Sequence, residues 1–355
     1  MSKIEYNLAD YRFRQQWMLL GLPFDAVTLD QACDRVYQAI DSRTRCFIST
    51  PNLNFVINAD KDPEFARSVW LSDLNLADGM PLVWAARWLK IPVPERVAGS
   101  TLFDSLVQRA TEERPLRVFF FGGDPGVAER AADVLNSQPG HAYCCGYLEP
   151  GRGSVESMSS DAIIEQINAS QADFLVVSLG AKKGQAWILH NLSRLDVPVV
   201  SHLGAVVNFV AGTVKRAPVV WQKLGLEWLW RIVEEPHLWR RYLGDGIAAL
   251  RLAVGVFKAR FHRAQISDSE VSIRHDTDTN LTIVLSGRPT AVALQGLYNE
   301  LNLHLNGART VNLHLVQADE SQAEISAFIK VLEAVCHVAH KPFNLNRQKQ
   351  PESSR

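Results

Sequence analysis

The sequence predicts an α/β fold built on a parallel sheet, and three observations carry this prediction. Apolar runs of strand length alternate with segments that have the apolar period of a helix. The runs are almost continuously apolar, which is typical of strands buried on both faces. Polar or glycine-containing turns follow the runs, at the places where an open α/β sheet binds its ligands. We therefore expect a doubly wound, Rossmann-like sheet with helices on both faces.

Four apolar runs are expected to form strands of this sheet. A helical pattern follows each run after a short turn. In chain order the runs are Arg45–Thr50 (RCFIST), Leu116–Phe121 (LRVFFF), Asp173–Leu179 (DFLVVSL) and Val197–His202 (VPVVSH). Together these elements predict that residues 1–214 form the α/β core.

Residues 215–263 have a helical pattern and an unusual composition. They hold four of the nine tryptophans and ten Lys and Arg residues against four acids, a local charge of +6. One interpretation is a pair of core helices with buried tryptophans and arginines at the rim. The other is a helical appendage at a membrane surface, where aromatic rings lie at headgroup level and arginines meet anionic lipid or diphosphate. The composition favours the membrane surface.

The chain changes character after the appendage. Residues 264–270 (AQISDSE) are polar and predict a linker. Residues 264–341 then carry five basic and nine acidic side chains, so the sign of the charge reverses. The pattern predicts a small C-terminal α/β domain over 271–347. Its strands are expected at 271–274, 281–285 and 310–316, and its helices at 291–305 and 323–339.

Length and composition exclude several classes of protein. The chain has 355 residues, of which 47% are hydrophobic and 21% charged, values that exclude a disordered chain, collagen and a small disulfide scaffold. A net charge of -1 gives no reason to expect nucleic acid as a partner. There is no run of eighteen apolar residues, and the charged N-terminus is unlike a signal peptide. The five cysteines lack zinc spacing, which predicts reduced thiols in the cytoplasm.

Polar side chains in the turns after the strands are the candidate site residues. Thr50 and Asn52 follow the first strand, where they either bind sugar hydroxyls or cap the next helix, and taken alone the cap is favoured. Asp78 precedes Gly79 after a short apolar run. It is either a general base held in a cleft or a residue that starts a turn, and taken alone the turn is favoured. His202 ends a strand and is expected to be packed and hydrogen-bonded.

Three more turns belong to the same edge of the predicted sheet. Gly122 and Gly123 let the backbone approach an anion at a helix N-terminus, or simply form a tight turn. Arg96 precedes a helix and is placed to clamp a phosphate. Gln185 lies in the turn GAKKGQ. The turns contain no cluster of metal ligands, so neither a catalytic metal nor a cofactor is expected.

Six segments of the chain carry a resemblance to a known family. In order they are STPNLNFVINAD, LADGMPLVWAAR, RVAGSTLFD, FFFGGDPGVAERAA, DFLVVSLGAKKGQ and GAVVNFVAGTVKRAPVVWQKLGLEWLWRIVEEPHLWRRYL. Over roughly residues 20–245 the chain resembles the WecG/TagA/CpsF family, glycosyltransferase family 26. The last segment is long enough to make a chance match improbable.

The resemblance implies a UDP-sugar-dependent enzyme of cell-surface polysaccharide synthesis. It would move an N-acetylmannosamine-type sugar to a polyprenyl-diphosphate-linked sugar, with inversion and without a metal. It would work at the inner face of the bacterial plasma membrane, as a cytoplasmic protein bound peripherally to the anionic surface. An inverting transfer needs a base for the attacking hydroxyl and positive groups for the departing UDP.

The resemblance also assigns roles to residues of this chain. Asp78 matches the general base, with Thr50 and Asn52 beside it in the pocket. Arg96 matches an arginine near a phosphate, and Gln185 a glutamine of the turn GxPxQE. The basic side chains that would hold the diphosphate are Arg216, Arg231, Arg240 and Arg241. This chain departs from the GxPxQE pattern, because Lys182 replaces the proline and Ala186 the glutamate.

The C-terminal segment more weakly resembles a STAS domain, in the order and length of its elements. This implies docking of a protein partner. Ser321 is nearest to the serine that is phosphorylated in such domains, although the DSSG pattern is absent.

Two other function classes compete with the transferase. A nucleotide-dependent oxidoreductase requires GxGxxG and an acid about twenty residues on, and the chain has GGDPG with no such acid. The second is a non-catalytic or regulatory scaffold, which binds a nucleotide sugar and acts through its STAS-like domain. An intact Asp78 argues against it.

Overall fold

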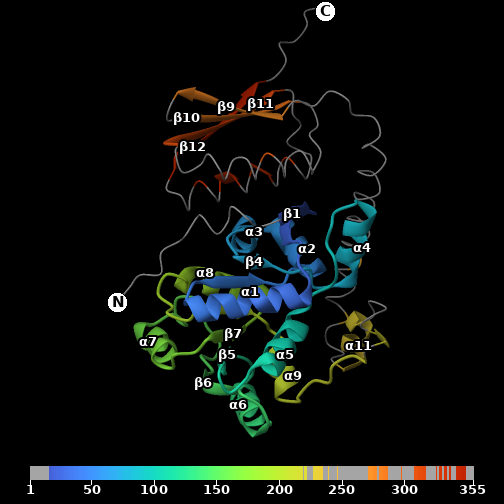
Figure 1. Cartoon of the computed structure of the whole chain (residues 1–355), viewed down its shortest axis with the longest axis vertical. Helices are drawn as coiled ribbons and strands as arrows, with labels where there is room; N and C mark the ends of the chain where they lie inside the picture. Colours follow the sequence, from blue (N-terminus) through green and yellow to red (C-terminus); the bar gives the residue numbers. More distant parts are fainter. Residues whose placement is uncertain are drawn as a thin grey trace, which may run out of the picture. The chain divides into compact units, whose positions relative to one another are not determined.

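Figure 1 shows the computed structural model of the chain, which describes residues 16–218 without a break. It also describes 220–221, 227–234, 239, 246, 271–277, 280–286, 297, 308–316, 325, 328–329, 332–333, 336 and 341–348. The chain divides into two compact units. Of the described residues, 27–84 and those from 93 to 246 belong to the first unit, and the rest belong to the second.

A six-stranded sheet forms the centre of the first unit. Its neighbouring strands are all parallel, in the order β4-β3-β8-β7-β5-β6. The strands are β3 (Cys46–Ser49), β4 (Leu74–Asn75), β5 (Leu116–Gly122), β6 (Ala142–Leu148), β7 (Phe174–Ser178) and β8 (Val199–His202). The prediction of a parallel α/β sheet is confirmed, and all four predicted strands are present.

Strand β6 was not predicted, and its position explains why. It lies at the edge of the sheet beside β5, and most of its side chains are partly exposed. Its sequence, AYCCGYL, therefore lacks the continuous apolar run of the inner strands. The backbone N–H of Cys144 donates to Oδ1 of Asn136 at 2.7 Å, so this side chain satisfies part of the open edge.

Helices cover both faces of this sheet (Figure 1). Alternate residues of β5 point to opposite sides, so Val118 and Phe120 join one buried cluster while Phe119 and Phe121 join the other. Residues of α1, α5, α6 and α9 pack in the first cluster, and residues of α7 and α8 in the second. The helices of the unit are α1 (Leu29–Ser42), α2 (Leu53–Lys61), α3 (Pro63–Trp70), α4 (Met80–Trp88), α5 (Gly99–Arg109), α6 (Val127–Ser137), α7 (Asp161–Ala169), α8 (Ala181–Asn191), α9 (Val206–Val210) and α11 (Glu227–Glu234), with α4 continuing into the second unit.

The order of the strands decides where the site lies. The chain places β4 outside β3, moves across to β5 and β6, and then returns to insert β7 and β8 between β5 and β3. The turns that follow β3, β4, β7 and β8 therefore meet at the carboxyl edge of the sheet. Such a switch point is where open α/β sheets form their crevice.

The second unit contains a hairpin and a separate four-stranded sheet. The hairpin pairs β1 (Gln16–Leu19) with β2 (Leu22–Asp25). The sheet has the order β12-β11-β10-β9, with β9 and β10 antiparallel and the other pairs parallel. Its strands are β9 (Val271–Thr277), β10 (Asn280–Ser286), β11 (Thr310–Val316) and β12 (Phe343–Gln348).

The strands expected at 271–274, 281–285 and 310–316 are present, whereas β12 was not predicted. Leu313 of β11 packs with Phe328 and Leu332, described residues within the helix expected at 323–339. Ser321 and the linker 264–270 lie outside the described residues. The domain boundaries, the STAS resemblance and the docking of a protein partner stay predictions.

Candidate active site

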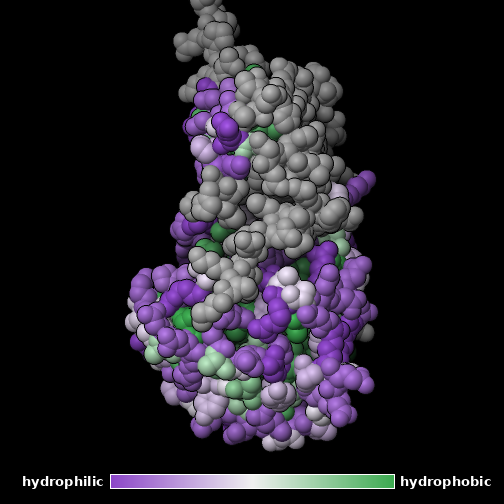
Figure 2. Space-filling view, turned by 60° about the vertical axis from the view of Figure 1, so that its left-hand side comes forward, coloured by the Kyte–Doolittle hydropathy of each residue, from purple (hydrophilic) through white to green (hydrophobic). Residues whose placement is uncertain are grey.

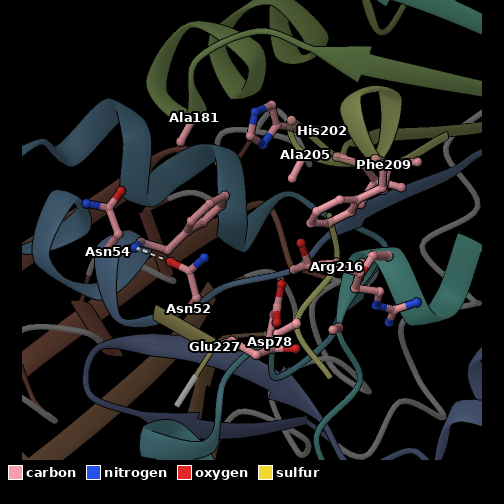
Figure 3. Close-up of a pocket in the computed structure, with 18 of the residues that line it drawn as sticks. Asn52, Asn54, Asp78, Ala181, His202, Ala205, Phe209, Arg216 and Glu227 are labelled. Atoms are coloured by element: carbon pink, nitrogen blue, oxygen red, sulfur yellow. Dashed lines mark hydrogen bonds between the residues drawn. The ribbon is translucent and has the colours of Figure 1, made fainter. Parts of the chain in front are cut away.

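A cavity of about 320 Å³ opens at the carboxyl edge of the six-stranded sheet (Figure 3). The turns after β3, β4, β7 and β8 and the start of α5 form its walls, together with residues 215–217 and α11. Its lining includes Thr50, Asn52, Asn54, Asp78, Ala98, Gly99, Ser100, Leu179, Gly180, Ala181, His202, Phe209, Lys215, Arg216, Glu227 and Trp230. Its size suits a ligand of the nucleotide-sugar class.

Thr50 and Asn52 both reach this cavity. Thr50 is buried, and Asn52 is the N-cap of α2, where its Oδ1 accepts a hydrogen bond of 3.2 Å from the N–H of Phe55 (Figure 3). Capping and cavity lining are therefore compatible for Asn52. Because the cap uses Oδ1, the amide Nδ2 is the group that Asn52 can offer to a ligand.

Asp78 lies next to Asn52 because the backbone joins their turns. The N–H of Asp78 donates to the carbonyl of Pro51 at 2.9 Å, and the N–H of Val97 donates to the carbonyl of Ala77 at 2.9 Å. Gly79 follows at φ +134°, a conformation that favours glycine. This turn presents a half-buried carboxylate to the cavity, where it can accept the proton of a ligand hydroxyl.

Cationic groups and two helix starts also line the cavity. Helices α5 and α8 begin at its wall, and neither has a hydrogen bond from the side chain of its N-cap residue. By contrast, Thr28, Asn52 and Asp62 cap α1, α2 and α3. The first N–H groups of a helix carry partial positive charge and bind anions. With Lys215 and Arg216 in the same lining, they are suited to bind a diphosphate.

Arg96 is bound to the appendage rather than placed in the cavity. Its guanidinium forms a two-armed ion pair with Glu227 of α11, with Nη1 at 2.7 Å and Nη2 at 3.2 Å from the carboxylate oxygens. It is Glu227 that lines the cavity. In this structure Arg96 therefore joins α11 to the core, and its role at a phosphate stays a prediction.

A second contact joins α11 to the start of the appendage. The indole Nε1 of Trp230 donates to the carbonyl of Lys215 at 3.1 Å. The ring of Trp221 meets that of Trp230 edge-on, with 5.8 Å between centroids. Trp230 thereby becomes part of the cavity wall.

The structure does not bring Gly122 and Gly123 to the cavity. A Cβ on Gly122 would lie 2.7 Å from the carbonyl oxygen of Ser178, so close packing of strands accounts for this glycine. The helix start that follows is already occupied, because Glu149 accepts hydrogen bonds from the N–H groups of Gly126 (2.9 Å) and Ala128 (3.0 Å). The Glu149 carboxylate thus lies at this helix start, and contact of Gly122 and Gly123 with an anion stays a prediction.

Gln185 also lies outside the cavity lining. It is fully buried, and its Nε2 donates to Ser49 Oγ at the end of β3 at 2.8 Å. The Ser49 hydroxyl lies 2.6 Å from that of Ser72. Gln185 therefore supports the end of β3, three residues before Asn52, which caps α2.

The predicted arginines of the appendage divide into two groups. Arg216 lines the cavity, and its guanidinium binds Asp104 and the Thr101 hydroxyl of α5. Arg231 lies within α11, but its side chain is not among those that the structure describes. Arg240 and Arg241 lie outside the described residues. Their role at a diphosphate or a membrane stays a prediction.

Some described apolar side chains of the appendage are exposed to solvent. They are Val220, Leu229, Val233 and Trp239. On the face drawn in Figure 2, hydrophilic residues cover most of the described surface, and hydrophobic residues form smaller areas between them.

Sequence reasoning missed Glu227 and Lys215 as parts of the cavity, whereas it placed the turn GAKKGQ, which begins at Gly180, at this edge of the sheet. Glu227 left one signal, since it is an acid in the first turn of a helix within a basic segment. Lys215 left none, because its place in the lining depends on which segments the sheet brings together.

His202 is packed and hydrogen-bonded, as expected. Its Nε2 lies 2.6 Å from the carbonyl of Leu179, which assigns the proton to Nε2, and its ring lies beside that of Phe55. Gly184 makes room for the ring, since a Cβ there would lie 2.2 Å from His202 Cδ2. Burial lowers the pKa of His202, and the hydrogen bond to Leu179 opposes this only in part. The imidazole is therefore neutral at pH 7.

We expect His202 to make the protein less stable in mild acid. The folded state disfavours the charged ring, so the unfolded chain binds more protons below its own pKa of about 6.5. The His202 contribution is fully present above that pH and is lost as the pH falls below it. The slope is at most about 1.4 kcal/mol per pH unit.

Urea unfolding between pH 5 and 7.5 measures this effect. The His202→Gln variant should show a smaller loss of unfolding free energy below pH 6.5 than the wild type. His190→Gln is the control, because His190 lies on the partly exposed side of α8, and it should keep the wild-type slope. Equal slopes in wild type and His202→Gln would contradict the prediction.

Among the residues that the structure describes, no group of three or more His, Cys, Asp or Glu side chains is arranged to hold a metal ion. No described helix is both long and apolar enough to cross a membrane.

Comparison with known proteins identifies relatives of this chain. Residues 17–265 match the model of a family described as "Glycosyl transferase WecG/TagA/CpsF family". A protein of Bacillus spizizenii (strain W23) is 31% identical over 58% of this chain and 77% of its own length. Proteins of Staphylococcus aureus strains MW2 and NCTC 8325 are each 26% identical over 63% of this chain and 85% of their own length. All three are named N-acetylglucosaminyldiphosphoundecaprenol N-acetyl-beta-D-mannosaminyltransferase.

Proposed function

The chain belongs to the WecG/TagA/CpsF family of glycosyl transferases, and we propose that it moves an N-acetylmannosamine-type sugar from UDP to a polyprenyl-diphosphate-linked N-acetylglucosamine. The names of its relatives support this acceptor and this sugar. The product would serve the synthesis of a cell-surface polysaccharide. The UDP donor and the inversion of the anomeric centre are part of the proposal.

The observation that carries the proposal is that one cavity is lined both by a carboxylate and by positive groups. Asp78 supplies the carboxylate, whereas Lys215, Arg216 and the two uncapped helix starts supply positive charge. Sugar transfer from a nucleotide diphosphate needs both. The carboxylate takes a proton from the attacking hydroxyl, and the positive groups stabilise the charge of the leaving group.

The proposed reaction is a single displacement. Asp78 accepts the proton of an acceptor hydroxyl while the oxygen of that hydroxyl attacks the anomeric carbon of the donor sugar. The bond between that carbon and the diphosphate oxygen breaks on the opposite face, so the configuration inverts. UDP leaves with the bonding electron pair, and the positive groups stabilise its new charge.

A panel of UDP-sugars tests the proposal with the full-length protein. Each is incubated with a short-chain lipid-diphosphate N-acetylglucosamine acceptor, and the product is identified by mass spectrometry. We expect transfer from UDP-N-acetylmannosamine or a close relative. If no sugar of the panel is transferred, the proposed function is wrong.

Activity should persist in EDTA, because we propose that side chains and helix starts take the charge of the diphosphate. The same assay in an excess of EDTA should give the rate that is measured without EDTA. Loss of activity that returns with Mg²⁺ or Mn²⁺ would contradict metal independence.

We also propose that the enzyme binds peripherally to the cytoplasmic face of the plasma membrane, where such an acceptor would be met. The charge of +6 on residues 215–263 supports this, and each basic side chain near an anionic surface contributes on the order of 1 kcal/mol. Sedimentation with anionic vesicles should therefore succeed at low salt and weaken at high salt, with neutral vesicles as the control. Protein that stays in the supernatant at low salt would contradict this location.

A further inference from the structure

Helix α4, labelled in Figure 1, is apolar on both of its faces. One face packs inward, because Leu82, Val83 and Ala86 are buried. On the outer face, Trp84 and Trp88 are 49% and 47% exposed. The two tryptophans are four residues apart, so they lie one turn apart on the same stripe of the helix.

An apolar outer face is unusual for a helix at the surface of a globular protein, where that face is normally polar. Helix α1 follows this rule, since its exposed residues are all polar. They are Asp30, Gln31, Asp34, Gln38, Asp41 and Ser42. In α4 the exposed residues are instead Pro81, Trp84, Arg87 and Trp88. Burial of the two indole rings against a partner would therefore be favourable.

The charge around this face is positive. Residues 79–94 contain two basic side chains, Arg87 and Lys90, and no acid. Both are exposed. Tryptophan rings beside basic side chains suit the level of the lipid headgroups, because the ring is amphipathic and the cations meet anionic lipid.

The same charges disfavour a second copy of the chain as the partner. In a twofold contact through this face, each α4 would meet its own equivalent. Arg87 and Lys90 would then approach cations, and residues 79–94 would offer no acid to them. An anionic membrane has no such conflict.

We propose that the outer face of α4 rests on the anionic membrane surface, with Trp84 and Trp88 at headgroup level. This contact is additional to the one proposed for residues 215–263. Its part in the reaction rests on the proposed function, which takes the acceptor to be embedded in the same membrane. Helix α4 begins two residues after Asp78, and Trp84 lies about 6 Å along the helix axis from Met80. The contact therefore holds the turn of Asp78 near the surface in which the acceptor lies.

Sedimentation of the full-length protein with vesicles tests the contact without any transfer of sugar. The vesicles contain phosphatidylglycerol and phosphatidylcholine. We expect Trp84→Ala/Trp88→Ala to lower the vesicle partition coefficient about tenfold, because two indole rings no longer leave water. The loss should be similar at low and high salt, since salt screens the attraction of basic side chains but not an apolar contact.

Tyr143→Ala/Tyr147→Ala is the matched control for this pair of substitutions. It removes two exposed aromatic rings from β6, where no membrane contact is proposed. Its partition coefficient should equal that of the wild type. Thermal unfolding verifies that each variant is folded.

Fluorescence then locates the two rings. Bromine atoms on the lipid chains quench the emission of tryptophans that lie close to them. Trp84→Phe/Trp88→Phe keeps two aromatic rings in place, so it should bind vesicles nearly as well as the wild type. The fraction of its emission that brominated vesicles quench should nevertheless be smaller, because two of the nine tryptophans are gone from the contact.

Equal vesicle binding by the wild type and Trp84→Ala/Trp88→Ala would overturn the proposal, as would equal quenching in the wild type and the phenylalanine variant. A wild type that does not sediment with vesicles would overturn it together with the proposed membrane location. A wild-type dimer in analytical ultracentrifugation that Trp84→Ala/Trp88→Ala dissociates would assign the face to a second copy. Sugar transfer is measured separately with the short-chain acceptor. A protein that binds vesicles through α4 but transfers no sugar would refute the proposed function and support the contact.

Discussion

Replacing Asp78 by Asn is expected to lower kcat by about 10²–10⁴, the usual contribution of a general base. Asparagine has nearly the shape of aspartate but cannot accept the proton of the acceptor hydroxyl. The backbone bond from Asp78 to Pro51 does not involve the side chain, so the turn should keep its conformation. Donor binding should also persist, because the positive groups of the cavity are unchanged. Steady-state kinetics and calorimetric titration with UDP measure the two effects separately.

Asp124→Asn is the matched control for this substitution. Asp124 also follows a strand of the six-stranded sheet, but it is exposed and absent from the cavity lining. Its variant should transfer sugar at the wild-type rate. If Asp78→Asn turns over within a few-fold of the wild type, Asp78 is not the base. If the variant loses UDP affinity instead of kcat, its role is in binding.

Breaking the ion pair between Arg96 and Glu227 is expected to lower kcat/KM about 10- to 100-fold. Hydrogen bonds between charged groups contribute about 1.5–3 kcal/mol, which corresponds to such a factor. This pair joins the core to α11, and α11 supplies Glu227 and Trp230 to the cavity wall. Without it, the weaker hydrogen bond from Trp230 to Lys215 is a described contact that still holds α11.

Glu227→Gln separates the two roles considered for Arg96. If Arg96 acts by fixing α11, then Arg96→Ala and Glu227→Gln should lose similar activity, and the double variant should lose little more than either. If Arg96 clamps a phosphate, Glu227→Gln should retain or gain activity, because it releases the guanidinium. Arg109→Ala is the control, since it removes a more exposed ion pair with Asp30 and Asp34 of α1.

The sequence alone was sufficient for the fold class and for part of the site. Strands buried on both faces must be apolar at nearly every position. Each of β3, β5, β7 and β8 can therefore be recognised from its own short stretch of sequence. Polar residues directly after such strands must lie at one edge of the sheet. This places Thr50, Asn52 and Asp78 together without any knowledge of the tertiary structure.

The tertiary structure decided which partner each candidate meets. Arg96 and Gln185 have the side chains expected of a ligand site, but Arg96 binds Glu227, 131 residues away, and Gln185 binds Ser49, 136 residues away. Likewise, Glu149 reaches the start of α6 from the loop after β6. A local sequence pattern predicts whether a residue is buried and whether it lies in a helix or a strand, because both depend on its neighbours in the chain. An ion pair or a capped helix start depends on segments that only the folded sheet brings into contact.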